Sequence, residues 1–255
     1  MRKLPRPVPW LAAGEDFPPL ESAWGHHDPA PGLLAAGAAL DVPTLVRAYS
    51  LGIFPWFSLG QPVLWWSPHP RMVLHTRNFK LHRSLRKSLN NFQNDPACEI
   101  RFDSAFEQVI NACASTPRTD QPGTWIVPDM VQAYSALHRA GHAHSVETWI
   151  EGELAGGLYC VNLGCMVFGE SMFAHRTDAS KIALAALVAF CRAQHISMID
   201  CQQNTRHLAS LGAAEISRPE FAAHLAQNIG KTAPRWRFEP LYWNQILTSR
   251  TPTPP

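Results

Sequence analysis

Hydrophobic residues are most concentrated in the centre of the chain, over residues 154–187. Residues 154–161 are rich in β-forming side chains, and residues 162–164, Asn-Leu-Gly, have the composition of a turn. Residues 165–173 predict a second strand of the same kind. Together these segments predict a β-hairpin at the centre of the fold.

A buried helix is expected directly after this hairpin. Asp178 and Ser180 are both good N-cap residues, and the helical pattern runs from Lys181 to about Gln194. Its apolar stretch, residues 182–191, is much shorter than the span of about 20 residues that crosses a membrane. The pattern therefore favours a helix that is buried over most of its circumference.

Glu170 interrupts the apolar pattern of the second strand. Because strand side chains alternate with period two, Met166, Phe168, Glu170 and Met172 are expected on one face. A carboxylate among three large apolar groups is costly to bury unless another group pairs with it. Glu170 is therefore a candidate functional residue; the alternative is an edge carboxylate that faces water or bonds to backbone.

A second polar pattern lies in residues 197–203, which predict another strand. Met198, Asp200 and Gln202 would share one face of this strand. The acid and the amide would then point the same way and could form a relay. The alternative is a solvated Asp and Gln at the C-terminal end of a strand, or a pair that caps a neighbour.

Residues 52–74 combine aromatic side chains with proline and glycine, which break any long element. Trp56, Trp65 and Trp66 lie in this segment. Aromatic rings on irregular backbone suit stacking on a planar ligand such as a nucleobase. The alternative is that they fill the seam between two domains, and composition alone favours this alternative.

Residues 78–92 have the period of an amphipathic helix. The apolar stripe consists of Leu81, Leu85, Leu89 and Phe92. The rest of the segment carries these basic or titratable residues and no acid: Lys80, His82, Arg83, Arg86 and Lys87. Such a run is usually a solvated face, but the missing acids favour a contact with phosphates.

The remaining pattern alternates helices with strands. A helix is expected over residues 43–50, and residues 1–31 are proline-rich and expected to be irregular. After residue 98 the expected strands are 98–102, 142–150 and 212–217, and the expected helices are 103–115, 128–141, 207–211 and 219–229. This order predicts an α+β or α/β layered domain. Residues 248–255 are expected to be disordered.

Composition places the chain among globular proteins, with 46% apolar and 16% charged residues. The net charge is only +2, so an anionic partner has to be met by a local patch. The first residues contain too many prolines for a signal peptide. With no spanning segment in the pattern, we expect a cytoplasmic protein that does not enter a membrane.

Cysteine and histidine usage gives little support to a metal site. The six cysteines include no Cys-x-x-Cys pair and mostly lie in apolar contexts, which favours reduced, buried thiols. His142 and His144 would share a strand face, but no matching cluster of Cys, Asp or Glu accompanies them. No metal is therefore expected.

Several separated blocks, in order, resemble the leucyl/phenylalanyl-tRNA–protein transferase family over residues 32–241. The blocks are GIFPWFS (52–58), LWWSPHPR (64–71), GTWI (123–126), GHAHSVE (141–147), GGLYCV (156–161), FGESMF (168–173), ASKIAL (179–184), IDCQ (199–202) and HLASLGA (207–213). So many blocks in one order make the resemblance specific. The chain departs from the family pattern at Cys160, where Gly is usual, and at Ala174, where Ser is frequent.

The resemblance implies an α+β protein with a small N-terminal domain over residues 1–70. The larger catalytic domain, over residues 71–247, would have the fold of the GNAT acyltransferases. An acyl-CoA site in that fold needs a glycine-rich turn for the pyrophosphate, and the segment AHRTDASK, residues 174–181, contains no glycine. The donor is therefore expected to be an aminoacyl ester on tRNA.

The activity implied by the resemblance is aminoacyl transfer without a metal or organic cofactor. Leu or Phe, with Met as a further candidate, would pass from aminoacyl-tRNA to the α-amine of proteins that begin with Arg or Lys. This marks those proteins for degradation by the N-degron pathway. The resemblance assigns Asp200 and Gln202 to orienting the amine and accepting its proton, and Glu170 to holding the cationic acceptor.

The resemblance also implies binding residues. Trp56 and Trp125 match positions near the terminal adenosine and the donor side chain, and Leu158 and Ile199 match positions of the apolar pocket. The basic helix would contact the acceptor stem of the tRNA through Arg83, Arg86 and Lys87.

Two other functions remain as alternatives. An acyl-CoA-dependent N-acetyltransferase of the same fold would be favoured by binding of CoA. A non-catalytic RNA-binding module would be favoured by RNA binding without transfer.

Overall fold

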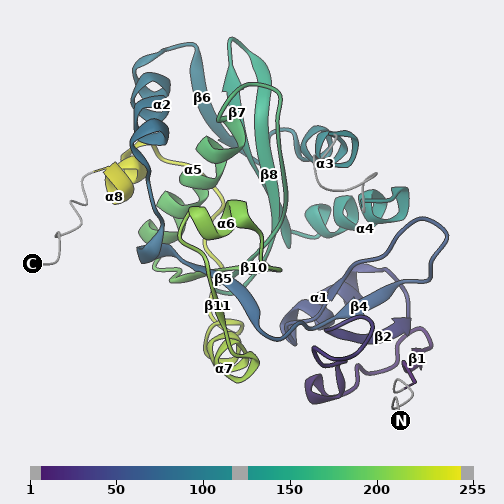
Figure 1. Ribbon diagram of the computed structural model, residues 1–255. Coiled ribbons are helices and arrows are strands. Elements are labelled where there is room, and N and C mark those ends of the chain that lie inside the picture. Colours follow the sequence, from purple (N-terminus) through teal and green to yellow (C-terminus); the bar gives the residue numbers. More distant parts are fainter. Residues whose placement is uncertain (1–6, 117–125, 248–255) are drawn as a thin grey trace, which may run out of the picture.

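The computed structural model describes residues 7–116 and 126–247, which form two β-sheets with helices packed around them (Figure 1). The smaller sheet has four strands in the order β1-β2-β4-β3, and the larger has seven in the order β11-β5-β10-β9-β8-β7-β6. The chain leaves the smaller sheet after Trp66 and enters the larger at Arg71. The predicted mixed α/β architecture with a small N-terminal part is therefore confirmed.

The N-terminal sheet is built from very short strands and one helix. The strands are β1 Trp10–Leu11, β2 Leu33–Gly37, β3 Phe54–Pro55 and β4 Leu64–Trp66. Helix α1, Val42–Ser50, confirms the predicted helix, and Asp41 caps it by accepting a hydrogen bond from the backbone N–H of Thr44 at 2.9 Å. The strands were not predicted because segments of two to five residues are too short to display an alternation.

The larger sheet contains the predicted central hairpin. Its strands are β5 Arg71–His75, β6 Cys98–Phe102, β7 Ala143–Ile150, β8 Glu153–Leu163, β9 Met166–Ala174, β10 Met198–Gln202 and β11 Ala214–Ile216. All neighbours are antiparallel except β9 and β10, whose parallel ladder comprises Ile199–Val167 and Asp200–Phe168. The ends of β9 and β10 beyond this short ladder are free to line a cavity.

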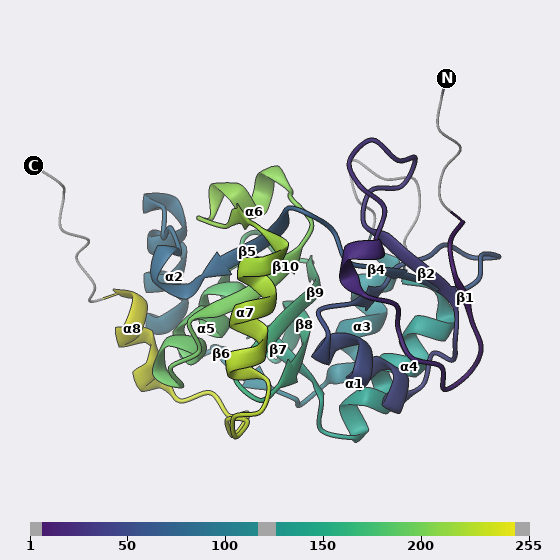
Figure 2. The ribbon, with the colours of Figure 1, turned by 90° about the horizontal axis from the view of Figure 1, so that it is seen from below.

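Helices cover both faces of the larger sheet (Figures 1 and 2). They are α2 Arg83–Asn94, α3 Phe106–Ser115, α4 Pro128–Arg139, α5 Ala179–Ala193, α6 Arg206–Ser210, α7 Arg218–Asn228 and α8 Asn244–Leu247, with 3-10 turns η1 Leu20–Ser22, η2 Thr76–Asn78 and η3 Pro240–Trp243. Helix α5 is buried continuously over residues 182–191, as predicted.

Two apolar cores lie on opposite faces of this sheet. One contains α5 with residues of α2 and α8. The other joins α3 and α4 to the N-terminal part, and it includes Tyr49, Phe54 and Trp65 together with Phe168. Because this second core is shared, the N-terminal helix α1 is held directly against the larger sheet.

The predicted common face of Met166, Phe168, Glu170 and Met172 is wrong at its far end. A β-bulge interrupts the pairing of β9 with β8, and Glu170 is the extra residue between the pairs Tyr159–Ser171 and Cys160–Gly169. Met166 and Phe168 belong to the core beside α3 and α4, whereas Met172 packs against the core on the α5 face. The bulge therefore changes which side chains accompany Glu170.

One expected helix start and one expected side-chain cap are also corrected. Helix α2 begins at Arg83 instead of residue 78, although its predicted apolar residues Leu85, Leu89 and Phe92 are buried. Asp178 precedes α5 in a left-handed conformation with φ 63° and makes no side-chain cap. Its carboxylate instead accepts a hydrogen bond from Ser88 and one from Lys181, each at 2.8 Å.

The histidine and cysteine positions have local explanations. His144 Nδ1 lies 2.8 Å from Asp103 Oδ2, and its ring stacks on Trp236. Asp103, expected to cap α3, instead accepts the backbone N–H of Ser145 at 2.8 Å. No disulfide joins the six cysteines, all of which lie in the described ranges. No helix in the described ranges has the length and apolar character needed to cross a membrane.

Candidate active site

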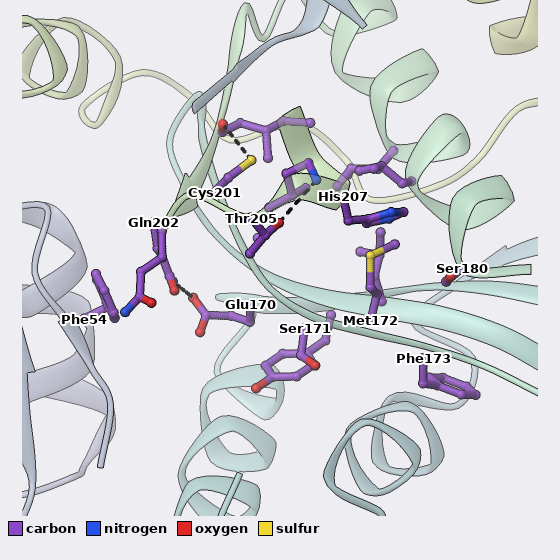
Figure 3. Close-up of a pocket in the computed structure, with 18 of the residues that line it drawn as sticks. Phe54, Glu170, Ser171, Met172, Phe173, Ser180, Cys201, Gln202, Thr205 and His207 are labelled. Atoms are coloured by element: carbon purple, nitrogen blue, oxygen red, sulfur yellow. Dashed lines mark hydrogen bonds between the residues drawn. The ribbon is translucent and has the colours of Figure 1, made fainter. Parts of the chain in front are cut away.

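A cavity of about 540 Å³ opens where β9 and β10 separate (Figure 3). Its walls are mainly apolar and come from β8, β9, α5 and β10. Predicted pocket residues Leu158 and Ile199 both line it, together with Met172, Leu184 and Leu187. Glu170 and Gln202 line the same cavity from the ends of the parallel strands. The site thus combines an apolar pocket with a small polar end.

Glu170 is held by three side chains from three elements. Its Oε1 accepts hydrogen bonds from the Tyr49 hydroxyl on α1 and from Gln202 Nε2 on β10, each at 2.7 Å. Its Oε2 accepts a longer bond of 3.3 Å from the hydroxyl of Tyr134 on α4. The two tyrosine hydroxyls also share a short hydrogen bond with each other. Among the described residues, Oε2 is therefore the less occupied of the two carboxylate oxygens.

Burial raises the pKa of Glu170 from its ordinary value to about 7. The hydrogen bond from Tyr49 opposes this rise in pKa, because it favours the charged carboxylate, and the negative charge of Asp200 adds to the rise. Burial, followed by the charge of Glu170, raises the pKa values of Tyr49 and Tyr134 well above those of ordinary tyrosines. The tyrosines therefore remain protonated donors, while Glu170 can gain or lose a proton near neutral pH.

Gln202 sits on a β-bulge at the end of β10, in a left-handed conformation with φ 61°. Its backbone N–H donates to Asp200 Oδ1 at 2.9 Å, and its side-chain nitrogen donates to Glu170. An ionised carboxylate only accepts hydrogen bonds, so the amide nitrogen must face Glu170. The amide oxygen of Gln202 is then the atom left to accept a bond from a ligand.

Asp200 lies two residues before Gln202, and both of its carboxylate oxygens accept hydrogen bonds. Arg71 donates to both of its oxygens, at 2.8 Å from Nε and 2.6 Å from Nη2. The Arg71 and Asp200 side chains are 1% and 0% exposed, and the guanidinium lies 4.9 Å and 4.6 Å from the ring centres of Phe54 and Phe221. Asp200 therefore contacts Gln202 through a hydrogen bond to the backbone N–H of Gln202. The side-chain amide of Gln202 is bonded to Glu170 instead.

The tryptophans of residues 52–74 divide between the two predicted roles. Trp65 is fully buried and donates to the carbonyl of Gly37 at 2.9 Å, so it fills the N-terminal core. Trp66 donates from its indole to the carbonyl of Trp56 at 2.6 Å. Trp56 itself lines the cavity and is placed where a planar ligand could contact it. Trp125 lies outside the described residues.

A second cavity of about 470 Å³ adjoins the first. Trp56, Gln202 and Gln203 line both. The rest of its lining is Pro29, Ala30, Pro31, Trp66, Pro68, Pro70 and Asn204. Among the described residues, this lining contains no cationic side chain, and it lies on the side of Gln202 that faces the N-terminal sheet.

The basic residues of α2 lie outside the linings of both cavities. Arg83 and Lys87 are exposed, whereas Arg86 is partly buried and donates to the carbonyl of Leu247 at 3.1 Å. Figures 1 and 2 both place α2 and the N-terminal sheet at opposite ends of the molecule. None of these three residues lines a described cavity.

Sequence reasoning missed Tyr49, Tyr134 and Arg71. The two tyrosines fall in amphipathic helices, where an aromatic residue at a buried position is indistinguishable from ordinary core. Arg71 carried a usable signal: it is a charged residue at the entry of the buried apolar strand Met72–Leu74, which requires a partner. The partner, Asp200, is 129 positions away and could not be named from spacing.

The fold and site place a titratable carboxyl and an amide beside an apolar cavity, an arrangement typical of an enzyme active site. Comparison of the sequence with known families defines it further. The model described as "Leucyl/phenylalanyl-tRNA protein transferase" matches residues 73–226, and that of the N-terminal domain of the same protein matches residues 38–69.

Curated relatives carry the same name. A leucyl/phenylalanyl-tRNA–protein transferase of Polaromonas sp. is 80% identical over 255 residues, 100% of both chains. One of Albidiferax ferrireducens is 62% identical over 97% of this chain and 98% of the relative. The chain belongs to the leucyl/phenylalanyl-tRNA–protein transferase family and is a transferase enzyme.

Solved structures show more distant likenesses. L-PGS from Bacillus licheniformis is 11% identical, with a TM-score of 0.40 over 77% of this chain and 72% of that one. An aminoglycoside N-acetyltransferase in complex with CoA is 14% identical, with a TM-score of 0.30 over 56% of this chain and 93% of that one.

Proposed function

We propose that this enzyme transfers leucine or phenylalanine from aminoacyl-tRNA to the α-amine of proteins that begin with arginine or lysine, which marks them for the N-degron pathway. Membership of the family supports the donor and the acceptor class. The observation that carries the proposal is the Glu170–Gln202 pair at the polar end of an apolar cavity. An aminoacyl ester would present its side chain to the walls and its carbonyl to this pair.

The apolar walls suit the side chain of the donor. Leu158, Met172 and Ile199 lie on neighbouring strands and Leu184 on α5, so a branched or aromatic side chain would meet apolar groups on several sides. Full burial of a Leu or Phe side chain contributes about 1.5–3 kcal/mol to binding. Trp56, at the rim shared by both cavities, is placed to contact the terminal adenosine.

The reaction joins an amine to an activated ester. The neutral α-amine attacks the ester carbonyl carbon, a C–N bond forms, and the C–O bond to the ribose oxygen breaks. The proton lost by the amine ends on that oxygen, so the products are the extended protein and deacylated tRNA. Since an α-amine has an ordinary pKa of about 7.7–8.0, modest assistance and good positioning suffice.

Gln202 and Glu170 are the groups placed to assist. The amide oxygen of Gln202 would accept a hydrogen bond from the amine and orient it. Glu170, through Oε2, would attract the cationic acceptor and take up the proton, since a pKa of about 7 suits exchange with an amine near neutral pH. Asp200 and Arg71 would fix the bulge that carries Gln202.

The decisive experiment measures transfer of labelled leucine from charged tRNA to a peptide that starts with arginine. A peptide that differs only in starting with alanine is the matched control and should not be extended. Binding of CoA in calorimetry would instead support an N-acetyltransferase, and tRNA binding without transfer would support an RNA-binding module.

Two variants locate the acceptor within the site. Glu170→Gln should raise the KM for arginine and lysine peptides more than it weakens binding of an aminoacyl adenosine, because it removes charge at nearly constant volume. Gln202→Ala should lower turnover by about 10²-fold, the scale of the loss when a reacting group is mispositioned. Collapse of donor binding in Glu170→Gln with an unchanged peptide KM would place Glu170 in the donor site instead.

A further inference from the structure

Two tyrosine hydroxyls converge on Glu170 from helices that are far apart in the sequence. Tyr49 belongs to α1 of the N-terminal part, and Tyr134 belongs to α4 of the larger domain. Both side chains are fully buried, and their hydroxyls bond to each other and to opposite oxygens of the carboxylate. The transfer chemistry described above uses neither hydroxyl, so their placement calls for a role of its own.

We infer that Tyr49 and Tyr134 are positioning residues that hold the Glu170 carboxylate in its ionised form and aim it at the amide of Gln202. The inference deepens the proposed function and rests on it. Neither tyrosine would touch the donor or the acceptor. Both would act through Glu170, by fixing its rotamer and by deciding over which pH range it can attract and deprotonate the acceptor.

The number of available protons supports this role. Each tyrosine hydroxyl has one proton, and Tyr49 gives its proton to Oε1 of Glu170. Tyr134 can then donate to the oxygen of Tyr49 or to Oε2. Gln202 Nε2 also donates to Oε1. The two hydroxyls and this amide are all donors, and an ionised carboxylate can accept a hydrogen bond from each of them. A protonated carboxyl would lose part of this bonding, so the network favours the charged form.

Other groups packed around Glu170 act in the opposite direction or are already neutralised. On β8, Tyr159 lies beside Tyr134, and the thiol of Cys160 is buried. On β10, the charge of Asp200 disfavours a second negative charge, but Arg71 on β5 pairs with it. The two hydroxyls and the amide of Gln202 are therefore the described groups that favour ionisation of Glu170.

This balance predicts the direction in which the pKa of Glu170 changes when a tyrosine hydroxyl is removed. Replacing either tyrosine by phenylalanine removes a donor to the carboxylate, so the pKa of Glu170 should rise above about 7. Less Glu170 is then ionised at neutral pH, and transfer should be lost there and regained at higher pH. A purely structural role would instead lower transfer by the same factor at every pH.

The test compares Tyr49→Phe and Tyr134→Phe with the unmodified enzyme over about pH 6 to 9. The quantity is the ratio of kcat/KM values, variant over unmodified, for one arginine peptide. The acceptor amine also titrates in this range, but its contribution cancels in the ratio. Tyr242→Phe is the matched control, since it removes a partly buried hydroxyl that accepts a bond from Gln194 far from the site.

We expect the ratio of kcat/KM values to fall by about tenfold from the alkaline to the acid end for both site variants. A fall of this size corresponds to a rise of about one pH unit in the titration midpoint of the Glu170 carboxyl. The ratio for Tyr242→Phe should stay constant. A ratio that is flat across the range for both site variants, whether near one or uniformly low, would overturn the inference.

A second measurement does not depend on catalysis. The carboxyl carbon of Glu170, labelled with ¹³C and assigned by its absence in Glu170→Gln, can be titrated by NMR without any substrate. Its midpoint should rise in Tyr49→Phe and in Tyr134→Phe and stay unchanged in Tyr242→Phe. An unchanged midpoint in both site variants refutes the inference. That result is independent of transfer, so failure of the unmodified enzyme to transfer leucine would refute the proposed function separately.

Discussion

At the scale of single residues, two carboxylates on adjacent strands meet opposite surroundings. Asp200 is clamped by the guanidinium of Arg71, so its lone pairs are committed to a salt bridge out of contact with water. Glu170 receives hydroxyl and amide donors and borders the cavity. This difference assigns proton exchange to Glu170 and a supporting role to Asp200 in the proposed chemistry.

The Asp200–Arg71 pair gives a stability prediction. Asp200→Asn leaves a buried guanidinium without its counter-charge and should lower the free energy of unfolding by about 3–5 kcal/mol. The double variant Arg71→Met with Asp200→Leu removes both charges and should be less destabilised than Asp200→Asn. Urea unfolding measures both, with Asp129→Asn, an exposed carboxyl on α4, as the control. Unchanged stability of Asp200→Asn would contradict the prediction.

The raised pKa of Glu170 predicts a pH-dependent stability. The folded-state pKa is about 7 and the unfolded value is about 4.3, so the folded state binds more protons between these values. The contribution of Glu170 to stability is therefore fully present below about pH 4 and is lost as the pH rises through about 7.

Comparison with Glu170→Gln isolates this contribution. The unfolding free energy of the unmodified protein minus that of the variant should fall by about 4 kcal/mol, as an upper limit, over this window and then level off. Urea unfolding at a series of pH values measures the difference. A difference that does not vary with pH would mean that Glu170 titrates normally in the folded protein.

At the scale of elements, helix α2 separates its charges into two groups. Arg83 and Lys87 project into solvent, whereas Arg86 bonds the carbonyl of Leu247 and ties α2 to α8. Ser88 on the same helix binds Asp178 at the start of α5. The exposed pair is therefore available to phosphates, and Arg86 also has a packing role.

The double variant Arg83→Ala with Lys87→Ala tests α2 without disturbing Arg86. We expect a higher KM for charged tRNA and a slope of log K against log salt that is shallower by about one for each cation that binds a phosphate. Transfer from aminoacyl adenosine, which has no stem, should be unchanged. A matched removal of two exposed charges, Arg139→Ala with Lys231→Ala, should have no effect. Equal damage to both donors would show that α2 shapes the active site.

At the scale of the whole molecule, the cavities and the basic helix define two directions of approach. Helix α2 lies at one end, and the N-terminal sheet lies at the other (Figure 2). The second cavity, whose lining within residues 7–116 and 126–247 contains no cation, opens on the N-terminal side of Gln202. We therefore expect the phosphate-bearing donor to come from the α2 side and the acceptor protein from the side of the N-terminal sheet.

Filling the second cavity tests this arrangement. Ala30→Phe should raise the KM for a five-residue arginine peptide by about tenfold and leave the KM for arginine amide unchanged, because only the longer acceptor extends into this cavity. Ala13→Phe, on an exposed turn of the N-terminal part, is the matched control. If Ala30→Phe instead raises the KM for charged tRNA alone, the cavity belongs to the donor.

Local pattern determined much of the fold. The central strands, the helices α1, α4 and α5, and the apolar stripe of α2 follow from periodicity and capping residues within short windows. The same patterns singled out Glu170 and Gln202, and the family blocks added Leu158 and Ile199; all four line the cavity. The family blocks also indicated the activity, because so many separated blocks in one order make the resemblance specific.

Tertiary structure decided how these residues meet. The bulges in β9 and β10 break the period-two rule at Glu170 and Gln202, so face assignments from spacing fail there. Tyr49 and Glu170 are 121 positions apart, and Arg71 and Asp200 are 129 apart. Spacing along the chain carries no information about such contacts, because they arise only when the shared core packs α1 and α4 against the larger sheet. The sequence therefore determined most of the elements and the family, and the packing decided which carboxylate is paired with a cation and which one borders the cavity.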